Sequence, residues 1–150
     1  MKKDIRQTVY LPYSPETVWH SLTTKEAISQ WLMETDFEAI QGYKFQFKTR
    51  PMGRNFDGIV HCQVLELKPH TRLSYSWRGG PGDGTIHLDS VVTWTLTPKG
   101  PGTELLLEHT GFERWKNFMA HFFMNMGWKS ILRKRLANYI TEHSHDTAHA

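Results

Sequence analysis

The sequence predicts an α+β domain in which a long C-terminal helix lies across a curved antiparallel sheet of about seven strands. Apolar residues recur at every second position through most of residues 43–109, which is the spacing of half-buried strands. They recur at helical spacing in residues 15–32 and again in the last third of the chain. One face of an open antiparallel sheet has to be buried, and only the final helix is long enough to cover it. We therefore expect a cavity between helix and sheet.

A single domain is expected at residues 1–142, followed by a polar tail at 143–150 that we expect to be disordered. Apolar residues make up 39% of the 150-residue chain and charged residues 22%, which is a globular composition. No run reaches the roughly 18 apolar residues of a membrane span, and the start of the chain lacks the apolar core of a signal peptide. The single cysteine, Cys62, excludes an intramolecular disulfide and favours a reducing, cytoplasmic location.

The first strand and two short helices are predicted in residues 4–32. Residues 4–11 alternate apolar and polar side chains, as a half-buried strand does. Ser14 and Pro15 then supply an N-cap and a first helical residue. Thr24 is a second N-cap candidate, and further apolar residues follow it at helical spacing. Two helices in tandem are therefore expected after the first strand.

The middle of the chain predicts antiparallel strands joined by turns. Tyr43, Phe45 and Phe47 alternate with polar residues, and the same alternation continues in IVHCQVLEL and LSYSW. GGPGDG is too rich in glycine to be anything but a loop, and PKGPG has the composition of a hairpin turn. The strand that returns from this turn ends near His109.

Two apolar stripes follow one another in the C-terminal third, which predicts a helix that ends near Ile140. The first consists of Trp115, Phe118, Met119, Phe122, Phe123 and Met126. The second consists of Trp128, Ile131, Leu132, Leu136, Tyr139 and Ile140. Glycine destabilises a helix interior by roughly 1 kcal/mol relative to alanine, so Gly127, where the phase changes, predicts a kink or a close approach to the sheet. Both stripes fit core packing, but the first also fits a pocket wall, because methionines adapt to varied ligands.

Four ordered blocks of the sequence resemble one protein superfamily. They are SPETVWHSLTTKEAISQWL, GIVHCQVLELKPHTRLSYSW, GTELLLEHTGF and GWKSILRKRLANYI, and together they span nearly the whole chain. The chain resembles the START-like (SRPBCC) superfamily, and within it the branch related to the C-terminal domain of the activator of heat shock protein 90 ATPase. This resemblance implies a helix-grip (Bet v-type) fold, with a long helix across a seven-stranded antiparallel sheet and a cavity between them.

The resemblance also implies a range of functions. Members of the superfamily bind lipids, hormones, polyketides and other apolar molecules, and a minority are enzymes. We therefore expect this chain to hold an apolar or aromatic, lipid- or polyketide-like ligand. A stress-related, cochaperone-like interaction protein is the alternative, although we expect no room here for the separate N-terminal chaperone-binding domain of the eukaryotic activator. The branch shares no catalytic motif, so no catalytic residue is assigned.

The predicted ligand wall combines aromatic residues of the sheet with residues of the helical regions. It consists of Trp31, Phe45, Phe47, Trp77, Trp94, His109, Phe112, Trp115, Met119, Phe122 and Met126. Trp31 and Trp77 are large, rigid and amphipathic, so a flat ligand is expected to stack on them.

Histidines are the main candidates for polar chemistry. His61, His109 and His121 come from different predicted elements and would suit zinc if they converged, but no metal-ligand spacing accompanies them, so no metal or other cofactor is predicted. His109 continues the inward parity of Leu105 and Leu107. It is either a hydrogen-bonded core histidine, which we favour, or a polar anchor for a ligand.

Other chemistry has little support. GxSxG, a Walker loop, a dinucleotide fingerprint and HExxH are all absent from the sequence. A cyclase- or hydrolase-like enzyme would need a titratable group facing the cavity, for which His61 and His109 are the candidates. The net charge of +3 predicts no nucleic-acid binding, and the basic residues at 129–135 fit a solvated helix face. Exposed strand edges predict a weak homodimer.

Overall fold

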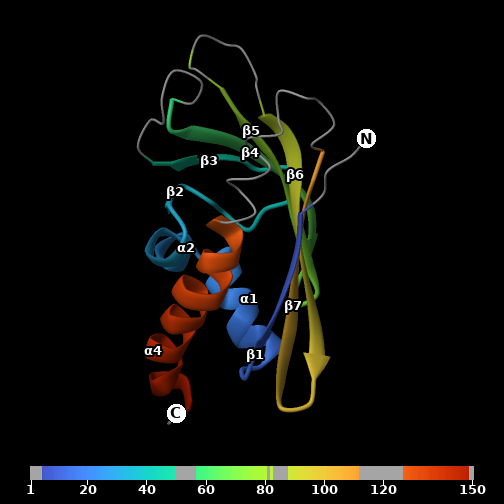
Figure 1. Ribbon diagram of the computed structural model, residues 1–150, viewed down its shortest axis with the longest axis vertical. Coiled ribbons are helices and arrows are strands. Elements are labelled where there is room, and N and C mark those ends of the chain that lie inside the picture. The colour runs from blue at the N-terminus through green and yellow to red at the C-terminus, as the bar shows by residue number, and fades with distance from the viewer. Residues whose placement is uncertain (1–4, 50–56, 81, 83–87, 112–126, 149–150) are drawn as a thin grey trace.

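The structure, a computed structural model, describes residues 5–49, 57–80, 82, 88–111 and 127–148 (Figure 1). In this part of the chain, seven strands form one sheet in the order β1-β7-β6-β5-β4-β3-β2, and every neighbouring pair is antiparallel. The strands are β1 (Ile5–Leu11), β2 (Glu34–Thr35), β3 (Lys44–Lys48), β4 (Ile59–Lys68), β5 (Arg72–Gly79), β6 (Leu88–Lys99) and β7 (Gly102–Thr110). The helices are α1 (Pro15–Thr23), α2 (Lys25–Trp31), the π-helical segment η2 (Ile131–Leu136) and α4 (Ala137–Ala148).

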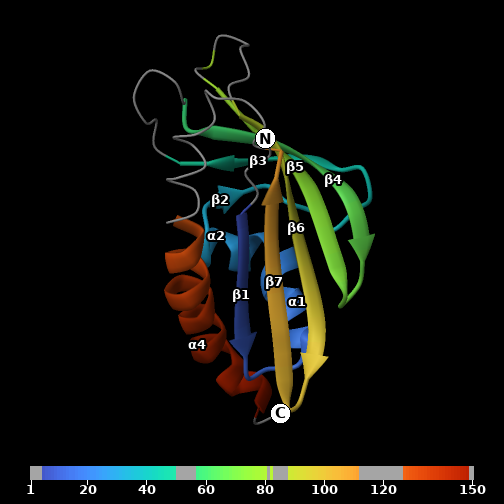
Figure 2. The same ribbon diagram turned by 45° about the vertical axis from the view of Figure 1, so that its right-hand side comes forward.

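The helices gather on one side of the curled sheet. Helix α1 packs against β6, β7 and α4, and α2 packs against β2 and η2. Figures 1 and 2 show the C-terminal helix running beside β1, where the Tyr13 and Thr141 hydroxyls are hydrogen-bonded at 2.9 Å. This arrangement confirms the predicted α+β helix-grip architecture of sheet, two short helices and C-terminal helix.

The first helix begins as its sequence predicts. The Ser14 hydroxyl accepts a hydrogen bond from the backbone N–H of Thr17 at 3.3 Å, and Pro15 occupies the first helical position. Thr24 precedes α2 in extended conformation, but its side chain makes no capping hydrogen bond there. Its hydroxyl instead donates to the carbonyl oxygen of His20 at 2.7 Å. Thr24 is therefore the N-cap residue of α2, as predicted, although its hydroxyl bonds to the last turn of α1 rather than to α2.

The C-terminal helix contains a π-helical segment, and this keeps its apolar residues on one face. Trp128, Leu132, Leu136 and Ile140 are all buried although they are spaced four residues apart. An α-helical turn takes 3.6 residues, so each such step would rotate the side chain by about 40°. A π-helical turn takes more residues and rotates the side chains in the opposite sense. The π-helical segment η2 therefore keeps the four on one side.

The neighbourhood of Gly127 differs from one expectation. The backbone is already helical at this residue, and a Cβ added to it would meet no described atom within 4 Å. The predicted close approach of helix and sheet at Gly127 is therefore wrong. The helix also continues to Ala148 rather than ending near Ile140. The division into a domain at 1–142 and a tail at 143–150 stays a prediction.

Candidate functional site

The concave side of the sheet carries a continuous cluster of aromatic residues. Six of the predicted wall residues belong to it and are at most 2% exposed: Trp31, Phe45, Phe47, Trp77, Trp94 and His109. They come from α2, β3, β5, β6 and β7. The other predicted wall residues lie outside the described residues: Phe112, Trp115, Met119, Phe122 and Met126.

Trp128, on the C-terminal helix, packs against two tryptophans of this cluster. Its ring packs on Trp77 at a centroid distance of 5.5 Å and, edge to face, on Trp94 at 5.6 Å. Trp94 in turn meets Trp31 edge to face at 5.9 Å, and Trp77 lies 5.2 Å from Phe47. Sequence reasoning placed Trp128 in the packing stripe and left it out of the wall. Its position at the boundary between the two stripes was the signal that could have included it.

A second extension of the cluster comes from the segment after β2. Phe37 is buried and packs edge to face on Phe45 at 4.9 Å and on Tyr75 at 6.4 Å. Tyr75 also lies 5.2 Å from Phe45. Phe37 was not among the predicted wall residues, because it follows a strand of only two residues that has no periodicity to read.

The polar edges of three tryptophans in the cluster are already hydrogen-bonded within the protein. The indole N–H of Trp31 donates to the carbonyl oxygen of Ser21 at 2.8 Å, and that of Trp94 donates to the Tyr75 hydroxyl at 2.9 Å. The indole N–H of Trp128 donates to Nδ1 of His109 at 3.0 Å. These three indole N–H groups are therefore not free to donate to a ligand.

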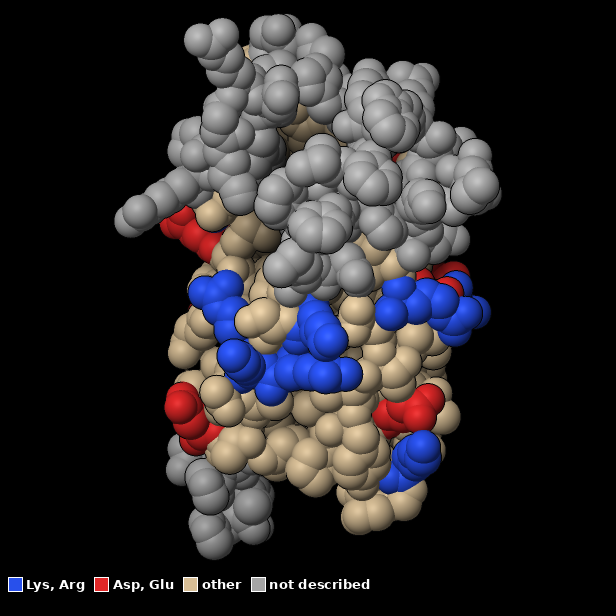
Figure 3. All heavy atoms as spheres, in the orientation of Figure 1, with Lys and Arg blue, Asp and Glu red and all other residues tan. Residues whose placement is uncertain are grey.

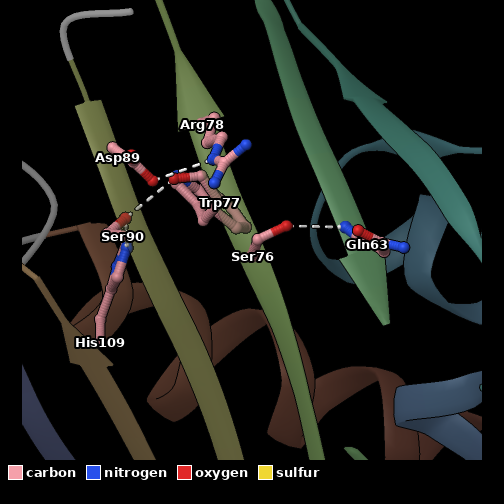
Figure 4. Close-up of polar contacts among 7 residues, drawn as sticks. All are labelled: Gln63, Ser76, Trp77, Arg78, Asp89, Ser90 and His109. Carbon is pink, nitrogen blue, oxygen red and sulfur yellow. Dashed lines mark hydrogen bonds and ion pairs between the residues drawn. The ribbon is translucent and has the colours of Figure 1, made fainter. Parts of the chain in front are cut away.

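His109 is the centre of a buried chain of hydrogen bonds that runs in one direction. Because Trp128 can only donate, His109 accepts at Nδ1 and carries its proton on Nε2. That Nε2–H donates to the Ser90 hydroxyl at 2.7 Å, and the hydroxyl donates to the carbonyl oxygen of Trp77 at 3.0 Å. Figure 4 shows Ser90 on β6 between His109 on β7 and Trp77 on β5.

The chain of hydrogen bonds links the C-terminal helix to three strands through side chains: β7 through His109, β6 through Ser90 and β5 through Trp77. His109 and Ser90 are 0% and 3% exposed. A charged imidazole would set an N–H on Nδ1 against the indole N–H of Trp128, so this arrangement holds the neutral ring. The geometry fits the core-histidine interpretation of His109.

His61 does not lie near His109. It is exposed on β4, where its Nδ1 lies 3.4 Å from Nε2 of Gln46, whereas His109 is buried on β7 with β5 and β6 between. His121 lies outside the described residues. Within the described ranges, no group of three or more His, Cys, Asp or Glu residues has the arrangement of a metal site.

Two buried acids beside the cluster stay protonated. Burial raises the pKa of the Cys62 thiol, and the charge of Asp36 adds to this rise. Burial likewise raises the pKa of the Tyr75 phenol, although its hydrogen bond from Trp94 opposes the rise. Neither group is therefore a nucleophile or a base at neutral pH.

A small groove lies at the β2–β3 edge of the sheet. It encloses about 120 Å³ and is lined by Glu34, Thr35, Asp36, Gln46 and Lys48. None of these is a predicted wall residue. The groove is small and charged, so it does not suit the apolar ligand that the aromatic cluster suggests.

Sequence comparison identifies the family. The profile of the Activator of Hsp90 ATPase homolog 1-like protein family matches residues 12–141. The chain belongs to this family. Membership confirms the resemblance to the activator branch of the START-like superfamily. The sequence matches no curated protein.

Solved structures agree with the family assignment. Protein MLL2253 from Mesorhizobium loti is 31% identical, with a TM-score of 0.83 over 94% of this chain and 98% of that chain. DynU16, a protein in the dynemicin biosynthetic locus, is 20% identical, with a TM-score of 0.73 over 92% of this chain and 47% of that one. The Aha1 dimer from Colwellia psychrerythraea is 20% identical, with a TM-score of 0.68 over 87% and 90%. The last two share the fold. No helix in the described ranges is both long enough and apolar enough to cross a membrane.

Proposed function

We propose that this member of the family binds an apolar or aromatic small molecule, lipid- or polyketide-like, between the sheet and the C-terminal helix. The observation that carries the proposal is the aromatic composition of the concave face. Phe47, Trp77, Trp128, Trp94 and Trp31 form an unbroken series of ring contacts across it. Aromatic rings supply flat apolar surfaces on which another flat molecule stacks.

The mode of recognition follows from the hydrogen bonds within the cluster. The indole N–H groups of Trp31, Trp94 and Trp128 already have acceptors in the protein. Affinity therefore rests on burial of apolar area, at roughly 25 cal/mol per Å², and on contacts between ring faces. Such a site selects ligands by shape more than by polar groups. The fold likeness to DynU16, from a biosynthetic locus, supports a small organic molecule as the occupant.

Trp77 provides the direct test of this proposal. We expect Trp77→Phe to weaken binding of a flat apolar ligand about fivefold, because one aromatic contact contributes roughly 1 kcal/mol. A panel of fatty acids and polycyclic aromatic compounds would be screened by tryptophan fluorescence and by amide chemical shifts. Trp19→Phe is the matched control, since Trp19 lies on α1 and its ring packs on His70, with no ring contact to the aromatic cluster among the described residues. No binding at micromolar concentration, or equal losses in the two variants, would contradict the proposal.

A cochaperone-like interaction is the second candidate, favoured by the family match over residues 12–141. Its test is a pull-down with the cognate Hsp90 combined with an ATPase assay. Stimulation that survives Trp77→Phe would separate this role from ligand binding. We further propose weak self-association, supported by the Aha1 dimer among the fold relatives, and a cytoplasmic location, supported by the single buried cysteine.

A further inference from the structure

Four cationic side chains lie together on the outer side of the C-terminal helix. We call them the basic helix patch: Lys129, Arg133, Lys134 and Arg135, all exposed. None of them forms an ion pair with a described carboxylate, and residues 127–141 contain no acid. Figure 3 shows blue side chains gathered across the middle of one face of the molecule. The four positive charges repel one another. An anionic surface that docks on the patch would offset this repulsion and would therefore bind there favourably.

Three carboxylates form an opposite surface on the neighbouring elements. We call them the acidic edge: Glu26 on α2, Glu34 on β2, and Asp36 just after β2, all exposed. In the described part of the chain none of them forms an ion pair. Lys48 lies in the same groove as Glu34 and Asp36, which lowers the net charge of the acidic edge without cancelling it.

The two surfaces are neighbours on one side of the molecule. The π-helical segment η2 packs against α2, and α2 packs against β2. Figures 1 and 2 both show α2 and β2 beside the upper end of the C-terminal helix. A basic and an acidic surface therefore lie side by side, and neither forms an ion pair among the described residues.

From this juxtaposition we propose that a second copy of this chain docks here, with the basic helix patch of each copy on the acidic edge of the other. Two neighbouring surfaces of opposite charge are self-complementary about a two-fold axis that passes between them, so one docking event forms both contacts. The proposal rests on the self-association proposed above and names its surface, which combines the C-terminal helix with α2 and the edge strand β2.

The contact would be polar and weak. The exposed large apolar side chains of the described residues are Tyr10, Ile40 and Leu65, and none of them belongs to either surface. Exposed ion pairs contribute little each and are screened by salt. The dimer is therefore expected at low ionic strength and high protein concentration, and salt should dissociate it.

The experiment compares charge reversals by sedimentation velocity at about 0.01 M and about 1 M salt. Arg133→Glu with Lys134→Glu reverses the basic helix patch, and Glu26→Lys with Glu34→Lys reverses the acidic edge. At low salt we expect each double variant to weaken dimerisation at least about tenfold, because both symmetric contacts become repulsive. Lys44→Glu with Lys68→Glu is the matched control: these exposed lysines lie on β3 and β4 and form no ion pair within the described residues.

Rescue makes the test specific. The variant that carries all four reversals has a negative helix and a positive edge, so it should dimerise again. The two double variants should likewise dimerise with each other when mixed, although neither does so alone. The control variant has the same net charge as the variant with the reversed helix, so an effect of net charge alone would weaken dimerisation in both.

Two results would overturn the assignment. A protein that stays monomeric at low salt and high concentration removes the surface together with the proposed self-association. A dimer that survives both double reversals keeps self-association but places it elsewhere. Neither result bears on ligand binding, since the charged surfaces contain no residue of the aromatic cluster.

Discussion

The hydrogen bonds of His109 determine its tautomer and the roles of its two partners as donor and acceptor. Its two ring nitrogens are hydrogen-bonded to Trp128 and Ser90. The indole N–H of Trp128 can only donate, and this fixes the direction of both hydrogen bonds. The sequence predicted that this side chain faces inward, from its parity with Leu105 and Leu107. Its partners could not be predicted, since Ser90 and Trp128 are each 19 residues away along the chain.

The hydroxyl of Ser90 should matter more to stability than that of a comparable surface serine. Ser90→Ala removes the acceptor of the buried Nε2–H of His109, and we expect a loss of about 1–3 kcal/mol in the free energy of unfolding. Ser76→Ala is the control, because the Ser76 hydroxyl accepts from the Gln63 N–H at 2.9 Å on a half-buried part of the sheet where water can replace it (Figure 4). Urea denaturation measures both. Equal losses would contradict the directed chain of hydrogen bonds.

Alkaline pH should destabilise the fold through Cys62 and Tyr75. Burial raises both pKa values above those of the unfolded chain, which are about 8.5 and 10. Below these values both states hold the protons, so the full stability is present. As the pH rises past them only the unfolded chain releases protons, and the free energy of unfolding falls. Urea midpoints between about pH 8 and 11 measure the fall. Cys62→Ala should flatten its first part, and an unchanged slope would exclude the thiol as its cause.

At the scale of the element, the C-terminal helix departs most from its sequence pattern. The period of the apolar residues located the helix and its second stripe correctly. The four-residue spacing of Trp128, Leu132, Leu136 and Ile140 was itself the signal of a π-helical segment. Because π-helices are rare, the apolar period by itself predicts a regular α-helix here.

Two glycines should respond to alanine in opposite directions. Gly127 is helical with open space where a Cβ would be, so Gly127→Ala should raise the free energy of unfolding by about 0.5–1 kcal/mol. Gly102 begins β7 where an added Cβ would overlap the carbonyl oxygen of Leu11 and lie 2.9 Å from the Cα of Pro12. Gly102→Ala should therefore lower it by more than about 1 kcal/mol. Thermal and urea unfolding compare the two, and destabilisation by Gly127→Ala would mean that the helix needs a glycine there.

At the scale of the whole molecule, the architecture was predictable and the full site was not. Alternation of apolar residues fixed the strands, and a single long amphipathic segment could cover only one face of the sheet. Trp31, Phe45, Phe47, Trp77, Trp94 and His109 are all buried, as the apolar spacing indicated, and their role as a ligand wall stays a prediction. The remaining predicted wall residues lie outside the described part of the chain. Periodicity also says which side chains turn inward but not whether they fill the space that they enclose, so the ligand stays a proposal.

The strand order also determines when the sheet can be completed during synthesis. Neighbours β3 through β7 follow one another along the chain, but β1 lies beside β7, with Ile5 opposite His109. Strand β1 thus has no strand partner until about a hundred further residues have been made, which at 5–20 residues per second is roughly 5–20 s of synthesis. During that interval the apolar side of β1 is unpaired and free to associate with other chains. Pairing of β1 therefore has to wait until β7 has been made.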